Sequence, residues 1–215
     1  MGILAIITAR GGSKGVPRKN IREFRGSPLI EWTIKAAQGS EFIDDVILSS
    51  DDAEIINLAK QNDCNVPFVR SSNLSQDSTP SIEVVLDAIN RYPNFDWVIL
   101  LQPTSPLRNS SHIDEAIKLC MKQKSMSCAS VTEVNQSPYW MFSLDDDKSM
   151  SPIVPGVLPK RRQELPPIYR LNGAIYIANV NWLKEYKTFV GDATTGYVMS
   201  NKSSLDIDKE EDFNK

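Results

Sequence analysis

The sequence predicts an α/β protein with a mostly parallel sheet covered by helices on both faces. Short apolar runs alternate with segments whose apolar residues recur every three or four positions, from residue 3 to about residue 132. Alternating strands and helices imply right-handed βαβ units. A loop rich in glycine and cations follows the first apolar run, where open α/β sheets place their ligands. At 215 residues, the chain is long enough for one main domain.

The predicted strands are short apolar runs. They cover residues 3–7, 46–48, 97–101, 127–132 and 173–177. The run at 97–101 is continuous, which is typical of a central parallel strand that is buried on both faces. We also expect a short edge strand at 66–69, because proline is poorly tolerated in a central strand and Pro67 lies within this segment.

The predicted helices begin at capping residues that precede an apolar stripe. Ser27-Pro28 and Thr79-Pro80 each place a capping side chain before a proline that suits the first helical position. Asp51 and Asp52 precede another helix, where N-capping is their simplest role. The segment from Ser111 to Asp114 predicts a capping box for a helix that turns Cys120 inward.

Residues 135–167 interrupt this rhythm. The segment contains six prolines, the acidic run Asp145-Asp146-Asp147 and the aromatics Tyr139 and Trp140. A disordered loop is one interpretation of this composition. An arm that contacts a partner is the other, because exposed aromatic side chains are typical of interfaces.

Composition narrows the class of protein. The formal net charge of -3 argues against non-specific binding to nucleic acid, so the cations of the loop should serve a small anionic ligand. The sequence has neither a membrane-spanning apolar run nor the pattern of a signal peptide, and we expect a cytosolic protein. The unclustered cysteines, Cys64, Cys120 and Cys128, favour reduced and mostly packed thiols.

The loop at residues 9–20, ARGGSKGVPRKN, is suited to binding a polyphosphate. Its glycines, Gly11, Gly12 and Gly15, permit positive φ angles and a close approach of backbone N–H groups to phosphate oxygens. Positive charge comes from Arg10, Lys14, Arg18 and Lys19. The spacing matches neither a Walker P-loop nor the G-x-G-x-x-G of dinucleotide binders, which argues against a dehydrogenase. A solvated basic turn is the alternative interpretation.

Two later segments carry further candidate ligands. Gln102 follows the buried run 97–101, and its amide offers a donor and an acceptor to a polar ligand, although a simple proline-rich turn is the alternative. Asp206 and Asp208 alternate with apolar residues, so an extended backbone places both carboxylates on one face. Such a pair suits Mg²⁺, which takes one or two carboxylates plus substrate phosphates. A solvated acidic tail is the alternative, because the acidic run continues to residue 212.

A nucleophilic mechanism finds little support. The single histidine, His112, falls in the first turn of a predicted helix and is expected on the surface, which disfavours a Ser-His-Asp triad or a multi-histidine zinc site. Cations for phosphates and carboxylates for a metal instead fit direct phosphoryl-type transfer by positioning and electrostatics.

Five motifs occur in order along nearly the whole chain. They are ARGGSKGVPRKN at 9–20, SSDD at 49–52, LQPTSPLR at 101–108, RLNGAIYI at 170–177 and SLDIDKEEDF at 204–213. Together they resemble the acylneuraminate cytidylyltransferases, or CMP-sialic acid synthetases. The resemblance implies a Rossmann-like three-layer nucleotidyltransferase fold in a single domain over residues 1–215. It also implies that CMP is transferred from CTP to a nine-carbon 2-keto sugar acid with Mg²⁺, releasing pyrophosphate.

The resemblance also implies roles for the matching residues. The nucleotide-binding set is Ala9, Arg10, Gly11, Gly12, Ser13, Lys19, Asn20, Arg70 and Ser81. The sugar-binding set is Gln102, Thr104 and Ser105, and Arg162 and Arg170 would meet the acidic sugar or phosphates. The metal carboxylates are Asp206 and Asp208, and the catalytic set is Arg10, Lys19 and Asp208. Residues 135–167 would form the arm of a homodimer that can contribute to the neighbour's site.

Several alternatives stay open at this point. The sugar could be sialic, legionaminic or pseudaminic acid, and the choice between Arg161 and Arg162 is open. A nucleotidyltransferase for another acid sugar or a sugar phosphate is one rival. A non-catalytic nucleotide-binding module of the same fold is another, because a fold does not guarantee an activity.

Overall fold

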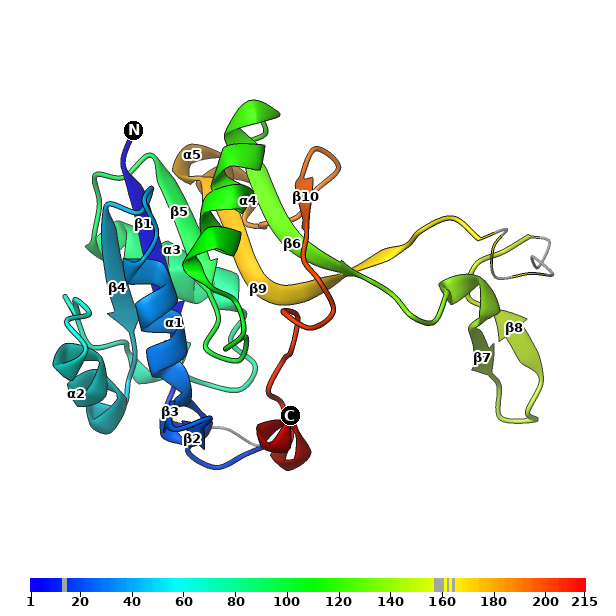
Figure 1. Ribbon diagram of the computed structural model, residues 1–215, viewed down its shortest axis with the longest axis horizontal. Helices are drawn as coiled ribbons and strands as arrows, with labels where there is room; N and C mark the ends of the chain where they lie inside the picture. Colours follow the sequence, from blue (N-terminus) through cyan, green and yellow to red (C-terminus); the bar gives the residue numbers. More distant parts are fainter. Residues whose placement is uncertain (13–14, 157–160, 162, 164) are drawn as a thin grey trace.

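The computed structural model describes residues 1–12, 15–156, 161, 163 and 165–215. Its centre is a six-stranded sheet of order β10-β6-β9-β5-β1-β4 with helices on both faces (Figure 1). The strands of this sheet are β1 (Ile3–Thr8), β4 (Asp45–Ser49), β5 (Trp97–Leu101), β6 (Ser127–Glu133), β9 (Tyr169–Asn179) and β10 (Thr195–Val198). The helices are α1 (Leu29–Gln38), α2 (Ala53–Gln61), α3 (Ser81–Arg91), α4 (Ser110–Lys122) and α5 (Val180–Tyr186). The predicted α/β class with a three-layer, nucleotidyltransferase-like arrangement is confirmed.

Most neighbouring strands run parallel, as expected. β1 pairs in parallel with β4 and β5, and β6 pairs in parallel with β10. β9 is antiparallel to both of its neighbours, β5 and β6. The reason is the connection: β9 returns directly from the arm instead of following a crossover helix. For the same reason it begins at Tyr169, before the expected start at residue 173.

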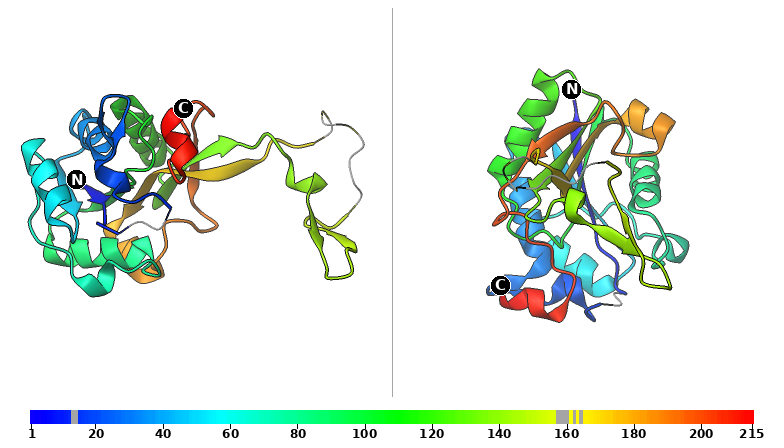
Figure 2. Two further views of the ribbon diagram at one scale, coloured as in Figure 1. Left: turned by 90° about the horizontal axis from the view of Figure 1, so that it is seen from below. Right: turned by 90° about the vertical axis from the view of Figure 1, so that its right-hand side faces the viewer.

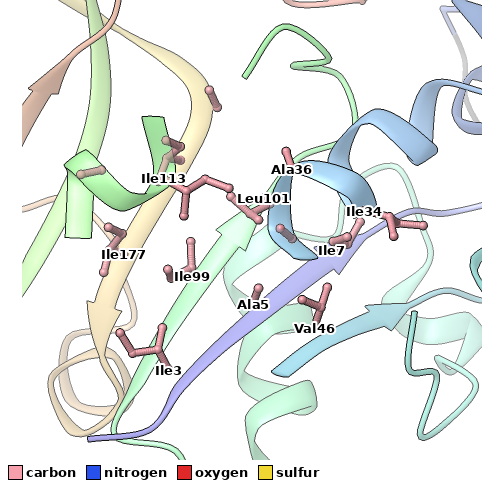
Figure 3. Close-up of a cluster of buried hydrophobic side chains, with 14 of the residues drawn as sticks. Ile3, Ala5, Ile7, Ile34, Ala36, Val46, Ile99, Leu101, Ile113 and Ile177 are labelled. Atoms are coloured by element: carbon pink, nitrogen blue, oxygen red, sulfur yellow. The ribbon is translucent and has the colours of Figure 1, made fainter. Parts of the chain in front are cut away.

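Alternating side chains of the central strands fill two apolar layers. Ile3, Ala5 and Ile7 of β1 face α1, α2 and α4, as the close-up in Figure 3 shows for part of this cluster. Leu4 and Ile6 face the opposite layer, which α3 and α5 cover. Strands buried on both faces in this way read as continuous apolar runs. Figure 2 shows the layers from two further directions.

Three local predictions were wrong. The segment 66–69 is a loop, and the residue before it, Asn65, forms an isolated bridge with Ile47. Ser27-Pro28 is strand β3, which pairs with β2 (Glu23–Phe24), so α1 begins at Leu29 without a side-chain cap. Thr79 likewise caps nothing, since the N-cap residue of α3 is Pro80 in an extended conformation.

The capping box of α4 lies two residues before the predicted one. The side chain of Asn109 accepts a hydrogen bond from His112 N, and His112 Nδ1 accepts one from Asn109 N. His112 is therefore half-buried rather than fully on the surface, and burial lowers its pKa. It lies in the cap and not in a catalytic triad. At α2 the simple interpretation is confirmed for Asp52, whose carboxylate caps the helix through Glu54 N and Ile55 N, but not for Asp51, which contacts Arg70.

A long arm projects from the sheet (Figures 1 and 2). Its base is the extension of β6 and β9, and Val134 N donates to Ile168 O at 2.9 Å where this pairing ends. The described part of its far end is the hairpin of β7 (Phe142–Leu144) and β8 (Met150–Pro152), preceded by the 3-10 helix η3 (Pro138–Trp140).

The cysteines are packed as predicted. Cys64, Cys120 and Cys128 are free and buried, and burial raises their pKa values to about 12, 11 and 12. None of the helices in the described part of the chain is long and apolar enough to cross a bilayer.

Candidate functional site

The loop after β1 lies at the carboxyl edge of the sheet beside the loops that follow β4 and β5. Ala9 is buried, and its N–H donates to Ser49 O at 3.1 Å. Gly11 N donates to the Asp51 carboxylate at 3.2 Å. Parallel strands bring their carboxyl ends to one edge, which is why segments 40 or more residues apart meet here.

The role predicted for two glycines needs correction. Neither Gly11 nor Gly12 has a positive φ. At Gly11 the constraint is space, since an added Cβ would lie 2.5 Å from Asp52 Oδ2. At Gly15 an added Cβ would lie 2.6 Å from Asp208 O. These glycines thus permit the loop to pack closely against two acidic segments.

Cations of this region contact carboxylates from other segments of the chain. The ion pairs are Arg10 with Asp77, Arg18 with Asp52 and Glu54, Lys19 with Asp208, and Arg70 with Asp51. Arg70 is buried, and burial lowers its pKa while Asp51 opposes that shift. The positive charges of Arg10, Arg18 and Lys19 are therefore balanced within the chain, and a polyphosphate would compete with these carboxylates.

One cavity of about 290 Å³ gathers most of the predicted nucleotide and sugar residues. Among its lining residues are the predicted Arg10, Gly12, Lys19, Asn20, Arg70, Ser81, Gln102 and Thr104. The segment from Leu74 to Thr79, between η2 (Ser72–Leu74) and α3, forms a further wall. Polar groups from three separate segments, 8–20, 70–84 and 102–104, thus converge on a single concave surface, as expected of a ligand site.

Asp206 and Asp208 lie next to the cavity residues Lys19 and Thr104. Lys19 Nζ donates to Ile207 O at 2.9 Å and to Asp208 Oδ1 at 3.0 Å. Ile207 N donates to Thr104 O at 2.8 Å, which fixes the acidic segment against the loop after β5. Ile207 itself is fully buried, so its two neighbours both turn away from the core.

The environment of the two carboxylates suits a cation. Burial raises the pKa of Asp206, a hydrogen bond with Thr104 opposes that shift, and the negative charge of Asp208 adds to it. A divalent cation would relieve this repulsion, and carboxylate oxygens are the ligands that Mg²⁺ prefers. No group of three acidic, histidine or cysteine side chains is arranged for metal binding among the described residues. Any Mg²⁺ would therefore need further ligands from a bound substrate.

Gln102 lies beside the backbone of Gly173 and the side chain of Arg108. An added Cβ at Gly173, whose φ is +77°, would lie 3.2 Å from Gln102 Oε1. The Gln102 carbonyl accepts a bond from the buried Arg108 at 3.3 Å. Ser105, predicted to bind sugar, is fully buried, and its Oγ has no hydrogen-bond partner among the described residues.

Arg170 does not line the cavity of about 290 Å³. It is exposed on β9 opposite Thr132 and lines a second cavity of about 640 Å³ together with Asp206. The two cavities share no lining residue, but Ile207, next to Asp206, is hydrogen-bonded to Lys19 and Thr104 of the first cavity. Ser13 and Arg162 lie outside the described residues, as does Lys14 of the loop.

The sequence analysis missed three residues of this region. Asp77 pairs with Arg10, Asp51 pairs with Arg70, and Arg108 lies behind Gln102. The motif at 101–108 already contained Arg108, and Asp51 had been assigned only a capping role. Asp77 lies in a polar segment without periodicity, so no sequence signal pointed to it.

Comparison with known proteins supplies the family. The sequence model described as "Cytidylyltransferase" matches residues 4–192. The chain is 37% identical to the CMP-N,N'-diacetyllegionaminic acid synthase of Legionella pneumophila, covering 97% of this chain and 91% of that one. It is 36% identical to the N-acylneuraminate cytidylyltransferase of Escherichia coli, covering 98% of this chain but 50% of that one.

The fold is also similar to a solved structure. A CMP:2-keto-3-deoxy-manno-octonic acid synthetase, determined with CTP, superposes with a TM-score of 0.75. The two chains are 13% identical, and the match covers 98% of this chain and 95% of that one.

Proposed function

The chain belongs to the family of CTP-dependent cytidylyltransferases, and on this premise we propose that it transfers CMP from CTP to a nine-carbon 2-keto sugar acid. The observation that carries the proposal is that loop cations and Gln102 line one cavity, and that Asp206 and Asp208 contact Thr104 and Lys19 at its edge. A triphosphate, a polar sugar and a metal each require one of these groups.

Arg10, Lys19 and Arg70 would bind the triphosphate. All three line the cavity and currently contact carboxylates, so a phosphate oxygen would take the place of a side-chain oxygen without leaving a cation unpaired. Asn20 and Ser81 line the same cavity and would contact the nucleoside. The backbone of Ala9 to Gly12 and the hydroxyl of Ser13 complete the predicted nucleotide set.

Asp206 and Asp208 would hold the Mg²⁺ ion. Bound there with phosphate oxygens, the ion would offset negative charge on the reacting phosphate and lower the pKa of a hydroxyl or water that it contacts. The Asp206 carboxylate is positioned by Thr104, and Lys19 contacts Asp208.

In the proposed reaction the anomeric hydroxyl of the sugar attacks the α-phosphorus of CTP in line. The bond from the α-phosphorus to the bridging oxygen of pyrophosphate breaks, and the hydroxyl proton leaves to solvent. Arg10 and Lys19 would stabilise the charge that develops on the leaving pyrophosphate. Catalysis would rest on this electrostatic stabilisation and on positioning, without a covalent protein intermediate.

The sugar acid would lie against Gln102 and Thr104, both of which line the cavity. Arg170, in the neighbouring cavity with Asp206, would bind its carboxylate. The substrate-binding roles predicted for Ser105 and Arg162 stay predictions.

We also propose that the arm at 135–167 joins two copies into a homodimer. Leu144 and Met150 pair across the β7–β8 hairpin and are 62% and 61% exposed, and Trp140, Met141 and Ile153 are also exposed. Clustered exposed apolar side chains are typical of interfaces. The location of the protein in the cytosol stays a prediction.

The proposed activity is tested by pyrophosphate release. The protein is incubated with CTP, Mg²⁺ and, separately, sialic, legionaminic, pseudaminic and 3-deoxy-manno-octulosonic acids, with a sugar 1-phosphate and with UTP as controls. We expect release with CTP and at least one nine-carbon acid, and none with the sugar phosphate. Release only with an eight-carbon acid or a sugar phosphate would reassign the substrate. Binding of CTP without release for any sugar would contradict an enzymatic role.

A further inference from the structure

Arg108 is the largest fully buried side chain among the residues that the structure describes, with 1% of its surface exposed. Burial lowers its pKa to about 9, so it remains a cation at neutral pH. A charge in the interior costs several kcal/mol of desolvation unless its partners compensate, and an apolar side chain of similar size is often at least as stable. Packing alone therefore does not account for an arginine at this position.

The hydrogen bonds of Arg108 connect three elements. Nε donates to Ala174 O at 3.1 Å on β9. Nη2 donates to Thr33 Oγ1 at 2.7 Å on α1 and to Gln102 O at 3.3 Å after β5. All three acceptors are neutral, so the guanidinium serves as a forked donor rather than as half of an ion pair.

Two of these acceptors lie where the ladder between β5 and β9 stops. The last antiparallel pair is Leu100 with Tyr176, and continuing this register would place Gln102 opposite Ala174. There the Arg108 guanidinium donates hydrogen bonds to the backbone carbonyls of both residues. Arg108 thus continues the connection between the two strands where their direct pairing has ended.

The same two residues determine the surroundings of the Gln102 amide. Ala174 follows Gly173, where an added Cβ would lie 3.2 Å from Gln102 Oε1. On the far side, Asn172 Oδ1 accepts a bond from Ala174 N at 3.2 Å and another from Ser130 Oγ at 2.6 Å. The 172–174 segment is therefore fixed from β6, and Arg108 connects it to the end of β5.

We infer that Arg108 is a positioning residue for Gln102. By bridging the carbonyls of Gln102 and Ala174, it sets the distance between the strand end that carries the amide and the glycine backbone beside it. The inference rests on the proposed function, in which Gln102 contacts the sugar acid. It predicts that Arg108 affects sugar use through Gln102 and leaves CTP binding almost unchanged.

The test is a double-mutant cycle with Arg108→Met, Gln102→Ala and the double variant. Arg108→Met should lower kcat/KM for the sugar acid by about ten- to a hundredfold, because a small misplacement of a substrate contact is costly. The Kd for CTP, measured by calorimetry without sugar, should change by less than about twofold. The double variant should match Gln102→Ala within about twofold, since residues acting through one contact are not additive.

Two variants separate positioning from packing. Thr33→Val removes an acceptor from the same Nη2 and the long bond of 3.5 Å from Thr33 Oγ1 to Gln102 O, but leaves the bridge from Arg108 to both carbonyls. It should therefore cost much less than Arg108→Met. Arg108→Lys keeps the charge and one donor and should recover part of the loss. It replaces Arg108→Met in the cycle if the methionine variant does not fold, which thermal unfolding checks.

A second measurement needs no turnover. Hydrogen exchange of the ligand-free protein should be faster in Arg108→Met for peptides covering 101–108 and 172–176, and unchanged for the loop 15–21. The inference would be overturned by multiplicative losses of kcat/KM in the cycle or by an equal loss for CTP and sugar. A Thr33→Val effect as large as that of Arg108→Met, or unchanged hydrogen exchange, would also overturn it. Failure of the proposed function is separate, since wild-type protein would then release no pyrophosphate with any nine-carbon acid.

Discussion

The sheet domain and the projecting arm differ in how their side chains are buried and paired. In the domain, both faces of the sheet are covered, and the cations of the loop contact carboxylates of the same chain. In the arm, Leu144, Met150 and Ile153 leave more than half of their side chains exposed, at 62%, 61% and 56%. In the domain, residues of one chain form the whole described cavity. The apolar residues of the arm, in contrast, would be buried only against another surface.

This difference separates two kinds of prediction. Substitutions in the cavity should change catalysis or the stability of one chain and leave association alone. Substitutions on the hairpin should change association and leave the unfolding of the domain alone.

Replacing Asp208 with asparagine should reduce kcat about a hundred- to a thousandfold. The variant removes a charge that would hold Mg²⁺ at the reacting phosphate and that now contacts Lys19. The measurement is the initial rate of pyrophosphate release at saturating CTP and sugar. Sedimentation of the variant should match that of the wild type.

Glu210→Gln is the matched control for this variant. It removes the same charge two residues away, where Glu210 is exposed and pairs with Arg22 outside the cavity. Turnover of Glu210→Gln should stay within about twofold of the wild type, as for other surface changes. Near-normal turnover of Asp208→Asn, or an equal loss in both variants, would remove the metal role of Asp208.

The double variant Leu144→Asp/Met150→Asp should raise the dissociation constant of the dimer at least about tenfold. The two side chains pair across the hairpin, and truncating or charging central apolar contacts commonly costs this much. Sedimentation equilibrium over a range of protein concentrations measures the constant. The unfolding temperature of the domain should not change when it is measured at a concentration where both proteins are monomers.

Ser143→Asp/Ser151→Asp is the control on the same hairpin. These residues also form a cross-strand pair and are exposed, but they carry no apolar surface. They should weaken the dimer less than the Leu144 and Met150 pair does. A wild-type protein that is monomeric at all concentrations, or equal effects of the two pairs, would contradict a dimer formed through this apolar cluster.

The sequence was sufficient for the parts of the site that depend on local pattern and on the sheet edge. Gln102 and the loop at 9–20 both follow buried strands, and parallel strands bring such segments together. It was insufficient for contacts between distant loops. Asp77 meets Arg10, and Arg108 meets Ala174, through tertiary packing that leaves no periodicity in the chain.

The errors in the fold have the same origin. Pro28 was assigned to a helix from its local capping pattern, but its pairing with Glu23 places it in an extended strand. The direction of β9 depends on the arm that precedes it, and strand composition carries no information on direction. Gly11 was predicted from its conformational freedom, whereas its actual constraint is the distance to Asp52.

Gly11→Ala should reduce the free energy of unfolding by about 1–3 kcal/mol, since its Cβ would lie 2.5 Å from Asp52 Oδ2 and 2.9 Å from Asp52 Cβ. Urea unfolding followed by circular dichroism measures the loss. Gly12→Ala is the neighbouring control, because an added Cβ there has nothing within 4 Å, and its effect should stay below about 0.5 kcal/mol. Equal losses at both positions would show that the contact with Asp52 does not determine the cost, since the lower entropy of the unfolded chain favours alanine at both.

The smallest effect concerns the pH dependence of the Asp52 cap. Burial opposes ionisation of Asp52, but hydrogen bonds from Ile55 N and Arg18 outweigh it and lower its pKa. Because the folded protein then binds protons less readily than the unfolded chain, this contribution is present above the ordinary carboxyl pKa of about 3.9 and disappears as the pH falls through the lower folded value.

Asp52→Ala should therefore cost about 1 kcal/mol of unfolding free energy at pH 7, with the difference from wild type shrinking below about pH 4. Asn179→Ala is the control, since Asn179 caps α5 through Asn181 N and Trp182 N without a charge. Its cost should be similar at pH 7 and should not shrink in acid. Chemical unfolding of the three proteins between pH 7 and pH 3 measures both differences. A constant difference for Asp52→Ala across this range would mean that the carboxylate stabilises the helix no better than its protonated form does.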